Sequence, residues 1–588
     1  MKYLTAISFA LAMVADETFD YVIVGAGTAG LVIANRLSAD PSVTVRVIDP
    51  GDDQRLNPNV SIPDNLGNPP GTDLDWKYKT VPQIHSNDRI LDAPQGKAWG
   101  GSSAINGMTY LRGDAAVFDA WESLGNKGWN WESMLPYFKR SEKFTPPNEE
   151  QLSAGATYVE DPHGYKGNIH VGYENTFVTN NFAPAATETW KKLGYSQCPD
   201  FNAGHVLGYS VAPQTRDSEK PLRWDSAVSY YSPVEHRKNL KIIKGTVKRI
   251  TWEPRSRGSS CKLVRADGVE YLDENGKLQS VSVGREVIVS AGTLRSPLVL
   301  EGSGVGNPSI LKKLGIETVV NLPGVGENLI EQPGGVAGTL SNTGGAAMSF
   351  IAMASAKDIF GDGLDAYREK VKGAIPEVAR SIVDATPGRA LSVKALEKQL
   401  RVQHDLLFNK NVAFAEIQTV PPPTLPATFT QFWILFPFAR GSLHLAHSDE
   451  LNTPLFDPRF FLTDLDLEGL AASGKVTQTF YSTSPMADIR LGPLPPPYDG
   501  LPDNATDAEM RAYLRNTAMV MNHQVGSMAM MSRDLGGVVD ADLKVHGTAN
   551  VRVVDASVMP TQISGHLTAV IYAIAEKAAD AIKASRKG

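Results

Sequence analysis

The chain has 588 residues, with 57 Lys and Arg against 64 Asp and Glu, and a net charge of −7. This acidic balance provides no basic surface of the kind that binds nucleic acid or an anionic membrane, so we expect neither partner. The length exceeds what one hydrophobic core usually supports, and the 42% hydrophobic content is enough for two domains.

The N-terminus resembles a secretory signal over residues 1–16. A lysine precedes an apolar run at residues 3–15, which contains the cleavage-like pattern Ala10-Leu-Ala12. The run is shorter than the roughly 20 apolar residues that span a bilayer, so we expect no stable membrane anchor. The alternative is a hydrophobic first strand, but the expected first strand begins later, at Tyr21. The segment therefore predicts secretion or residence in a secretory compartment.

An apolar strand from Tyr21 runs into Gly25, Gly27 and Gly30, followed by an amphipathic helix over residues 31–38. The first glycine permits the tight turn, the second lets backbone amides approach a pyrophosphate, and the third lets the helix pack on the strand. The anion then sits at the helix N-terminus. This arrangement predicts a dinucleotide site.

The same site is predicted to include Thr28 and Ala29, which lie between the glycines. A second strand over residues 43–48 leads to Asp49, at about the spacing where a carboxylate binds the adenosine ribose. The alternative is an ordinary glycine turn, but strand, glycines, helix, second strand and acid occur in the order of the motif. Nicotinamide and flavin cofactors share the adenosine end, so this segment does not distinguish them.

Two further glycine-rich segments lie at residues 96–119 and 285–306. In the first, small residues are densely packed around Ser102 and Asn106, which suits a backbone lying against a flat ring system. We expect these two side chains and main-chain amides to meet ring heteroatoms. The alternative is a glycine-rich surface loop. The second segment is a buried-strand pattern followed by a turn and another glycine cluster.

Residues 96–119 and 292–306 resemble the two signatures of the glucose-methanol-choline (GMC) oxidoreductases. The resemblance runs over nearly the whole chain and includes residues 324–328, 440–444 and 551–566. Within the family, the chain is most similar to the fungal glucose oxidase and FAD-dependent glucose dehydrogenase branch. This implies noncovalently bound FAD and oxidation of a small-molecule alcohol to a carbonyl, with O2 or a quinone as the electron acceptor. A homodimer is compatible with the resemblance.

The resemblance also implies which residues meet the cofactor. Asp555 matches the position near the flavin's ribityl chain and pyrophosphate. The full predicted set is Gly25, Gly27, Thr28, Ala29, Gly30, Asp49, Ser102, Asn106, Gly107, Met108, Thr109, Val247, Asp555, Ala556 and Leu567.

Two histidines are candidate catalytic residues. A flavin takes a hydride from carbon while a base within roughly 3 Å takes the hydroxyl proton, and histidine suits this task at neutral pH. The segment over residues 521–530 resembles the family's catalytic histidine loop, so His523 is the expected general base. His566 resembles its partner, which would orient the hydroxyl, share its proton or stabilise an alkoxide. The sequence shows neither the Cys or His spacing of a zinc site nor a hydrolase elbow, so no metal is expected.

The residues before His523 bear on the substrate. Glucose-active relatives place an Arg and an Asn there, whereas this chain has Met519 and Met521. Methionine offers almost no hydrogen bond, and each unpaired buried hydroxyl of a sugar costs about 1–3 kcal/mol. With Met528 and Met530 close by, this pattern predicts a soft, apolar pocket for an aromatic, furan or polyketide-like alcohol.

Several alternatives stay open at this point. In one alternative, some of these methionines are core residues. In another, the alignment with the relatives is shifted by two residues, which would bring Arg515 or Asn516 to the site. The enzyme would then be a sugar (glucose) oxidase or dehydrogenase. Family members such as hydroxynitrile lyases and the versicolorin cyclase keep the flavin without net oxidation, so a cyclase or lyase is a further alternative. A nonenzymatic nucleotide-binding protein would need no histidine pair.

The predicted fold is α/β, with a Rossmann-like FAD-binding domain interleaved with a substrate domain built on an antiparallel sheet with helices. The FAD-binding segments are residues 17–50, 86–150, 225–330 and 535–588, and the lid and substrate-binding segments are 51–85, 151–224 and 331–534. Residues 57–75 are expected to form a lid loop, residues 340–430 helical insertions, and residues 565–585 a long final helix.

Only two cysteines occur, Cys198 and Cys261, so one disulfide is possible. Neither lies where the glucose oxidases place their bridge, and we expect free thiols. Asn59 and Asn504 lie in sequons that permit glycosylation on the secretory route.

Overall fold

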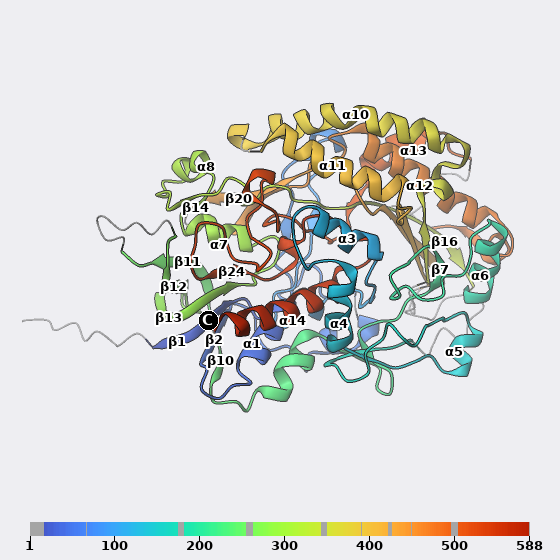
Figure 1. Ribbon diagram of the computed structural model, residues 1–588. Helices are drawn as coiled ribbons and strands as arrows, with labels where there is room; N and C mark the ends of the chain where they lie inside the picture. The colour runs from blue at the N-terminus through green and yellow to red at the C-terminus, as the bar shows by residue number, and fades with distance from the viewer. Residues whose placement is uncertain are drawn as a thin grey trace, which may run out of the picture.

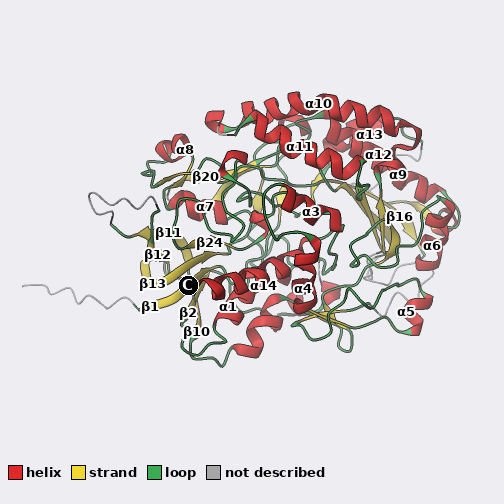
Figure 2. Ribbon diagram, in the orientation of Figure 1, coloured by secondary structure: helices red, strands yellow, loops and turns green. Residues whose placement is uncertain are grey.

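The computed structural model describes residues 17–65, 67–174, 182–254, 263–342, 350–389, 391–421, 426–448, 450–494 and 504–586. The predicted signal at residues 1–16 and Cys261 lie outside the described residues. Two seven-stranded sheets organise the chain, one at each end of the molecule, with helices α1 (Thr28–Leu37) and α14 (Leu567–Ser585) beside the first (Figures 1 and 2).

The first sheet has the strand order β10-β2-β1-β13-β12-β11, and β24 lies beside β13. The pairs β10–β2, β2–β1, β1–β13 and β13–β24 are parallel, and the pairs β13–β12 and β12–β11 are antiparallel. The apolar run of β1 is buried on both faces, as a central parallel strand requires. The strands are β1 (Thr18–Val24), β2 (Val45–Asp49), β10 (Leu240–Lys244), β11 (Thr246–Trp252), β12 (Ala266–Leu272), β13 (Leu278–Val289) and β24 (Val551–Val553).

The second sheet has the order β22-β16-β19-β18-β17-β7, with β23 beside β16, and all its pairs are antiparallel. Helix α12 (Asp464–Ser482) packs on β16, β18 and β19, where the Thr430 and Tyr481 hydroxyls are 2.8 Å apart. The strands are β7 (Gly208–Val211), β16 (Pro333–Ser341), β17 (Phe350–Ala354), β18 (Ala415–Val420), β19 (Ala427–Ile434), β22 (Arg490–Pro493) and β23 (Met519–Val520).

Side chains alternate across β18 and β19, because successive residues of a strand point to opposite faces. Thr430 faces α12, so Gln431 and Trp433 face the other way, and the register places Glu416 opposite Trp433 and Gln418 opposite Gln431. This second face points into the interior of the molecule. Helices α10 (Leu364–Ala385), α11 (Val393–Phe408) and α13 (Asp507–Thr517) lie with α12 along the top of the molecule (Figure 1).

The remaining elements are short and connect or cover the two sheets. The helices are α2 (Pro58–Ser61), α3 (Ala115–Ser123), α4 (Trp131–Ser141), α5 (Glu149–Ser153), α6 (Phe182–Lys192), α7 (Ser296–Gly302), α8 (Pro308–Lys313) and α9 (Ala356–Phe360). The strands are β3 (Tyr78–Lys79), β4 (Asp92–Ala93), β5 (Glu142–Phe144), β6 (Ile169–Val171), β8 (Arg216–Asp217), β9 (Leu222–Arg223), β14 (Val305–Gly306), β15 (Val320–Asn321), β20 (Ser442–His447) and β21 (Glu450–Asp457).

The α/β fold with a second, antiparallel sheet is confirmed. The assignment of chain segments to the two domains stays a prediction, and it agrees with where the strands of each sheet lie in the chain. Residues 340–430 are not only helical insertions, because this segment also contains β17, β18 and the first half of β19 beside α9, α10 and α11. None of the described helices combines the length and hydropathy needed to cross a membrane.

Candidate active site

A cavity of about 520 Å³ lies between the two sheets. Its glycine end is lined by Gly25, Gly27, Asp49 and Val247 of the first sheet and its turns. Its histidine end is lined by Gln418, Gln431 and Trp433 of the second sheet, together with Met519, Met521, His523 and His566. The cavity therefore brings both predicted catalytic histidines and both predicted pocket methionines together with the dinucleotide motif.

The predicted cofactor residues line this cavity, with one exception. They are Gly25, Gly27, Thr28, Ala29, Asp49, Ser102, Asn106, Gly107, Met108, Thr109, Val247, Asp555, Ala556 and Leu567. Gly30 lies behind them, where an added Cβ would stand 2.0 Å from the carbonyl oxygen of Gly25. It therefore serves the close packing of α1 on its strand.

The N-terminus of α1 is open toward the cavity. The helix starts at Thr28, after an N-cap glycine that provides no side-chain hydrogen bond, and its first turn holds no acidic residue. The first N–H groups of a helix have no partner within it, and the helix dipole favours an anion there. Gly25 has a φ of 106°, and an added Cβ would lie 2.5 Å from the Ser290 carbonyl oxygen, so only glycine fits this turn. The observed groups fit a pyrophosphate.

Asp49 connects two turns at the glycine end. Its carboxylate accepts hydrogen bonds from the backbone N–H of Ala26 and of Gly51, each at 2.7 Å. Burial raises the pKa of Asp49 to about 6. Each carboxylate oxygen can accept another hydrogen bond, so the residue fits the hydroxyls of a ribose.

Ser102 and Asn106 already have partners within the protein. The Ser102 hydroxyl donates to Gln95 at 2.9 Å, and the Asn106 side-chain oxygen accepts from Arg223 at 2.8 Å and from the N–H of Met108 at 3.1 Å. These bonds hold the glycine-rich turn in shape, and Met108 has a φ of 65°. The turn borders the cavity, and a contact of Ser102 and Asn106 with ring heteroatoms stays a prediction.

Asp555 joins two distant parts of the chain. Its carboxylate accepts from the N–H of Gly292 at 2.9 Å and from the Ser296 hydroxyl at 2.6 Å, at the start of α7. It also accepts from the N–H of Ser557 at 2.9 Å, and burial raises its pKa. The residue thus fixes the second glycine segment against Ala556 in the cavity wall.

His523 and His566 form a pair at the other end. Their ring centroids are 4.9 Å apart and their planes cross at 78°. Trp433 of β19 lies beside both, with centroid distances of 6.0 Å to His523 and 5.8 Å to His566. His523 follows β23, and His566 is the N-cap of α14. The two sheets and the last helix therefore assemble a pair that lies 43 residues apart in the sequence.

Gln332 determines which nitrogen of His523 carries the proton. The Gln332 amide nitrogen donates to the Leu435 carbonyl at 2.9 Å, so its oxygen faces Nδ1 of His523 at 2.7 Å. Because a carbonyl oxygen only accepts, Nδ1 must donate and Nε2 keeps its lone pair. Burial and the neighbouring His566 hold the pKa of His523 well below its usual range. The ring is therefore neutral at pH 7 and can act as a base at Nε2.

Buried acidic side chains support both histidines. Glu416 of β18, with a fully buried side chain, lies 2.8 Å from Nε2 of His566. Glu331 accepts hydrogen bonds from the N–H of Gln332 at 2.9 Å and of His523 at 3.3 Å. Burial raises the pKa of Glu331 to about 8, so it is largely protonated at neutral pH. Glu416 therefore contacts a histidine ring, whereas Glu331 holds the backbone turn that carries His523.

Sequence reasoning missed Gln332, Glu416, Gln418, Gln431 and Trp433. Two signals were present: Gln332 follows the family-like segment 324–328 by a few residues, and Glu416 and Gln418 interrupt an apolar strand at a spacing of two. A charged side chain inside a buried strand is a candidate functional residue, because its burial requires a partner.

The methionines divide between pocket and core. Met519 and Met521 line the histidine end, and Met521 is only 9% exposed because its sulfur packs on the backbone of Gly334. Met528 and Met530 are fully buried in the core and do not line the cavity, which agrees with the alternative that some of these methionines are core residues.

The alternative alignment does not bring new polar residues to the site. Arg515 donates to the His85 carbonyl at 2.6 Å, and the Asn516 side chain bonds to Asn87 at 2.7 Å. Both contacts are with the segment before β4, and neither residue lines the cavity. Of these four residues, only Met519 and Met521 line the cavity.

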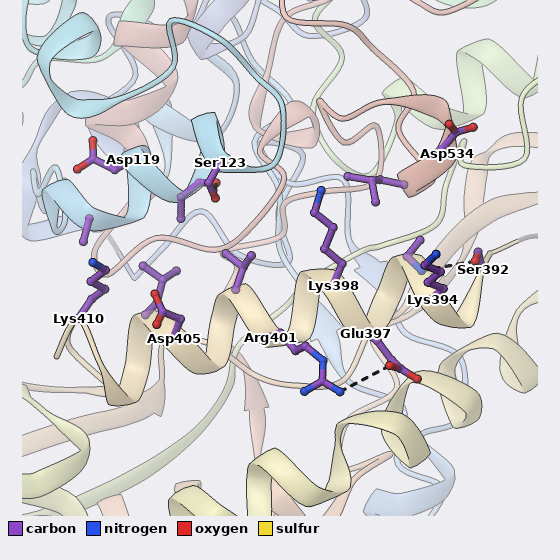
Figure 3. Close-up of a pocket in the computed structure, with 16 residues that line it drawn as sticks. Asp119, Ser123, Ser392, Lys394, Glu397, Lys398, Arg401, Asp405, Lys410 and Asp534 are labelled. Carbon is purple, nitrogen blue, oxygen red and sulfur yellow. Dashed lines mark hydrogen bonds and ion pairs between the residues drawn. The ribbon is translucent and has the colours of Figure 1, made fainter.

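A second cavity, of about 1040 Å³, lies between α3, α11 and the turn at residues 533–535. Figure 3 shows its rim of acidic and basic side chains, including Asp119, Lys398 and Asp534. It contains none of the predicted cofactor or catalytic residues. Within the described ranges, no group of three or more His, Cys, Asp and Glu side chains is arranged to hold a metal ion.

Comparisons with known proteins show the family of the chain. Family models described as GMC oxidoreductase match residues 19–334 and 437–575. The chain is 51% identical to "Glucose oxidase-like protein fsoC" of Humicola fuscoatra, over 97% of this chain and 96% of that protein.

Solved structures with the same fold include an FAD-dependent oxidoreductase from Chaetomium thermophilum, with a TM-score of 0.87, 27% identity, and coverage of 97% of this chain and 100% of that one. A fungal aryl-alcohol oxidase has a TM-score of 0.82 and 26% identity, over 97% of this chain and 100% of that one. The chain therefore belongs to the GMC oxidoreductase family and is an FAD-dependent oxidoreductase.

Proposed function

We propose that the enzyme oxidises an alcohol with a largely apolar body to a carbonyl, with His523 as the general base. The observation that carries the proposal is the neutral His523 ring, whose unprotonated Nε2 is set by Gln332 in the same cavity as the open N-terminus of α1. FAD, when bound, supplies the hydride acceptor. The residues contribute binding, orientation and the movement of one proton.

The glycine end binds the anionic and adenosine parts of the cofactor through α1 and Asp49. At the histidine end, Nε2 of His523 takes the proton of the substrate hydroxyl as the carbon loses its hydride. His566 orients the same oxygen, and Glu416 holds that ring in place through a 2.8 Å contact with its Nε2. Gln332 keeps His523 in the one tautomer that can accept this proton.

Met519, Met521 and Trp433 favour an aromatic, furan or polyketide-like alcohol. The aryl-alcohol oxidase with the same fold supports this class. Glucose is the second candidate, because the 51% identical relative carries the name glucose oxidase-like protein, and Gln431 supplies an amide at this end. A cyclase or lyase without net oxidation is the third.

Absorbance of the flavin without oxygen tests the substrate class. The panel contains benzyl alcohol, furfuryl alcohol, a polyketide lactol and glucose. Loss of the oxidised flavin band with an apolar alcohol, and retention of the band with glucose, is the expected result. Loss with glucose alone would contradict the assigned substrate class, and retention with every compound would favour the cyclase or lyase.

We also propose secretion and reoxidation by O2 or a quinone. The signal-like segment at residues 1–16 supports secretion, and Asn504 is exposed at its sequon. Mass loss after endoglycosidase treatment of protein secreted from a fungal host would support this route, whereas full intracellular retention would contradict it. Oxygen uptake compared with quinone reduction identifies the acceptor.

A further inference from the structure

The histidine end of the cavity carries a pair of glutamines that the oxidation chemistry does not use. Gln418 and Gln431 stand directly opposite each other on β18 and β19, and both line the cavity. They lie on the same face of the sheet as Glu416 and Trp433, at a distance of two residues along each strand. This distance is about 7 Å. The amides therefore lie beside the reaction centre and displaced from it along the sheet.

The two amides differ in their partners. The Gln418 amide nitrogen reaches the Thr109 hydroxyl at 3.4 Å, a long contact toward the flavin-facing turn. Gln431 is half-buried, and its amide forms no hydrogen bond with any part of the chain that the structure describes. An amide in a partly desolvated cavity favours a ligand that supplies the missing bonds.

The charge of the lining limits what that ligand group can be. Three ionic side chains line the cavity, namely Asp49, Arg295 and Asp555. Asp49 and Asp555 are bonded at the glycine segments, and Arg295 stacks over Trp76 at 4.3 Å. Around the glutamines the cavity lining therefore contains no aspartate, glutamate, lysine or arginine side chain. A charged substituent would be buried there without a counter-ion, which is costly.

We infer that Gln431, with Gln418 beside it, selects alcohols that carry a neutral hydrogen-bonding group at the end of the molecule away from the oxidised carbon. The group is a carbonyl, carboxamide or hydroxyl, because a glutamine amide both donates and accepts. The rest of the substrate is apolar and lies against Met519 and Trp433. This inference rests on the proposed function and narrows its substrate class.

Matched alcohols test the inference. 4-(Hydroxymethyl)benzamide and 4-isopropylbenzyl alcohol have similar shapes and differ in the polar group, and 4-(hydroxymethyl)benzoate adds a charge. For the holoenzyme, kcat/KM is expected to be about tenfold higher for the benzamide than for the isopropyl compound, the effect of one buried hydrogen bond. The benzoate is expected to be the poorest of the three.

Gln431→Met keeps the side-chain length and removes the amide, so the preference for the benzamide should disappear. Gln197→Leu changes an exposed glutamine outside the cavity and should leave the preference unchanged. Flavin content and Tm show whether each variant is folded. Equal kcat/KM for the two neutral alcohols in the wild type, or a preference that persists in Gln431→Met, would overturn the inference.

Binding of compounds without a reactive hydroxyl separates recognition from oxidation. Calorimetry with 4-methylbenzamide and 4-isopropyltoluene should show tighter binding of the amide, and Gln431→Met should remove the difference. If this difference appears while none of the alcohols reduces the flavin, the proposed oxidation fails and the recognition by Gln431 stands. If the difference is absent, the inference fails even where the alcohols are oxidised.

Discussion

Gln332 and His523 form the residue-scale unit on which the proposed chemistry depends. One amide faces two partners, the Leu435 carbonyl and the His523 ring, and this arrangement leaves only one tautomer of the histidine. The low pKa of His523 keeps that tautomer neutral. A base prepared in this way needs no proton removal before the reaction.

Gln332→Glu should move the pH dependence of the reaction. A carboxylate beside Nδ1 stabilises the protonated ring and raises the pKa of His523. Because only the unprotonated ring accepts the substrate proton, the acidic limb of kcat/KM should shift to higher pH, with lower activity at neutral pH and recovery in alkali. Profiles of kcat/KM between pH 4 and 9 measure this shift. An unchanged limb would show that Gln332 does not act through the protonation of His523.

At the scale of elements, the contact between α1 and β1 depends on Gly30. An added Cβ would stand 2.0 Å from the Gly25 carbonyl oxygen, so Gly30→Ala must displace the helix N-terminus. We expect the purified variant to have a lower flavin content and a lower Tm. Gly373→Ala in α10 is the control, because its added Cβ meets no atom within 4 Å. Full flavin content in Gly30→Ala would contradict the role assigned to this contact.

Strand β20 is held to α7 by a buried ion cluster. Nδ1 of His444 lies 2.8 Å from Glu301 of α7, and its Nε2 lies 3.1 Å from Glu327. These carboxylates raise the pKa of His444 to about 10, although burial alone would lower it. Since the ordinary pKa of histidine is about 6.5, the stabilisation from this charge is complete below that pH. It decreases as the pH rises and is lost above about 10.

Tm measured between pH 6 and 10.5 should therefore fall more steeply in the wild type than in His444→Gln. The variant should also be less stable at pH 6, because two buried carboxylates lose their cation. Parallel Tm curves for the two proteins would contradict a charged His444.

The sequence predicted those parts of the site whose residues lie close together along the chain. The dinucleotide motif and the two histidine loops were located because their residues lie within short segments of fixed spacing. Glu416 and Gln431 were missed, because their place in the site follows from the register of β18 and β19 and from the packing of that sheet near α14. Met528 lies close to His523 in the sequence, and only the structure shows that its side chain lies in the core.

For the whole molecule, the cavity between the two sheets makes stability depend on the cofactor. A ligand that binds only the folded state stabilises it by about 2.7 kcal/mol at a concentration of 100 times its Kd. Tm of deflavinated protein should therefore rise with added FAD and should not rise with equal concentrations of AMP and riboflavin, each of which fills only part of the cavity. A Tm that is independent of FAD would contradict binding between the sheets.

The proposed reaction needs the two sheets, the cofactor and His523 together. Rapid mixing of the enzyme with an alcohol in the absence of oxygen tests it most directly. Wild type and His523→Ala, both loaded with FAD, are mixed with the best apolar alcohol of the panel, and the rate of flavin reduction is followed by absorbance. We predict that the variant keeps its flavin and is slower by about 10²- to 10⁴-fold, the usual contribution of a general base. Equal rates of flavin reduction in the two proteins would contradict the assignment of His523 as the base.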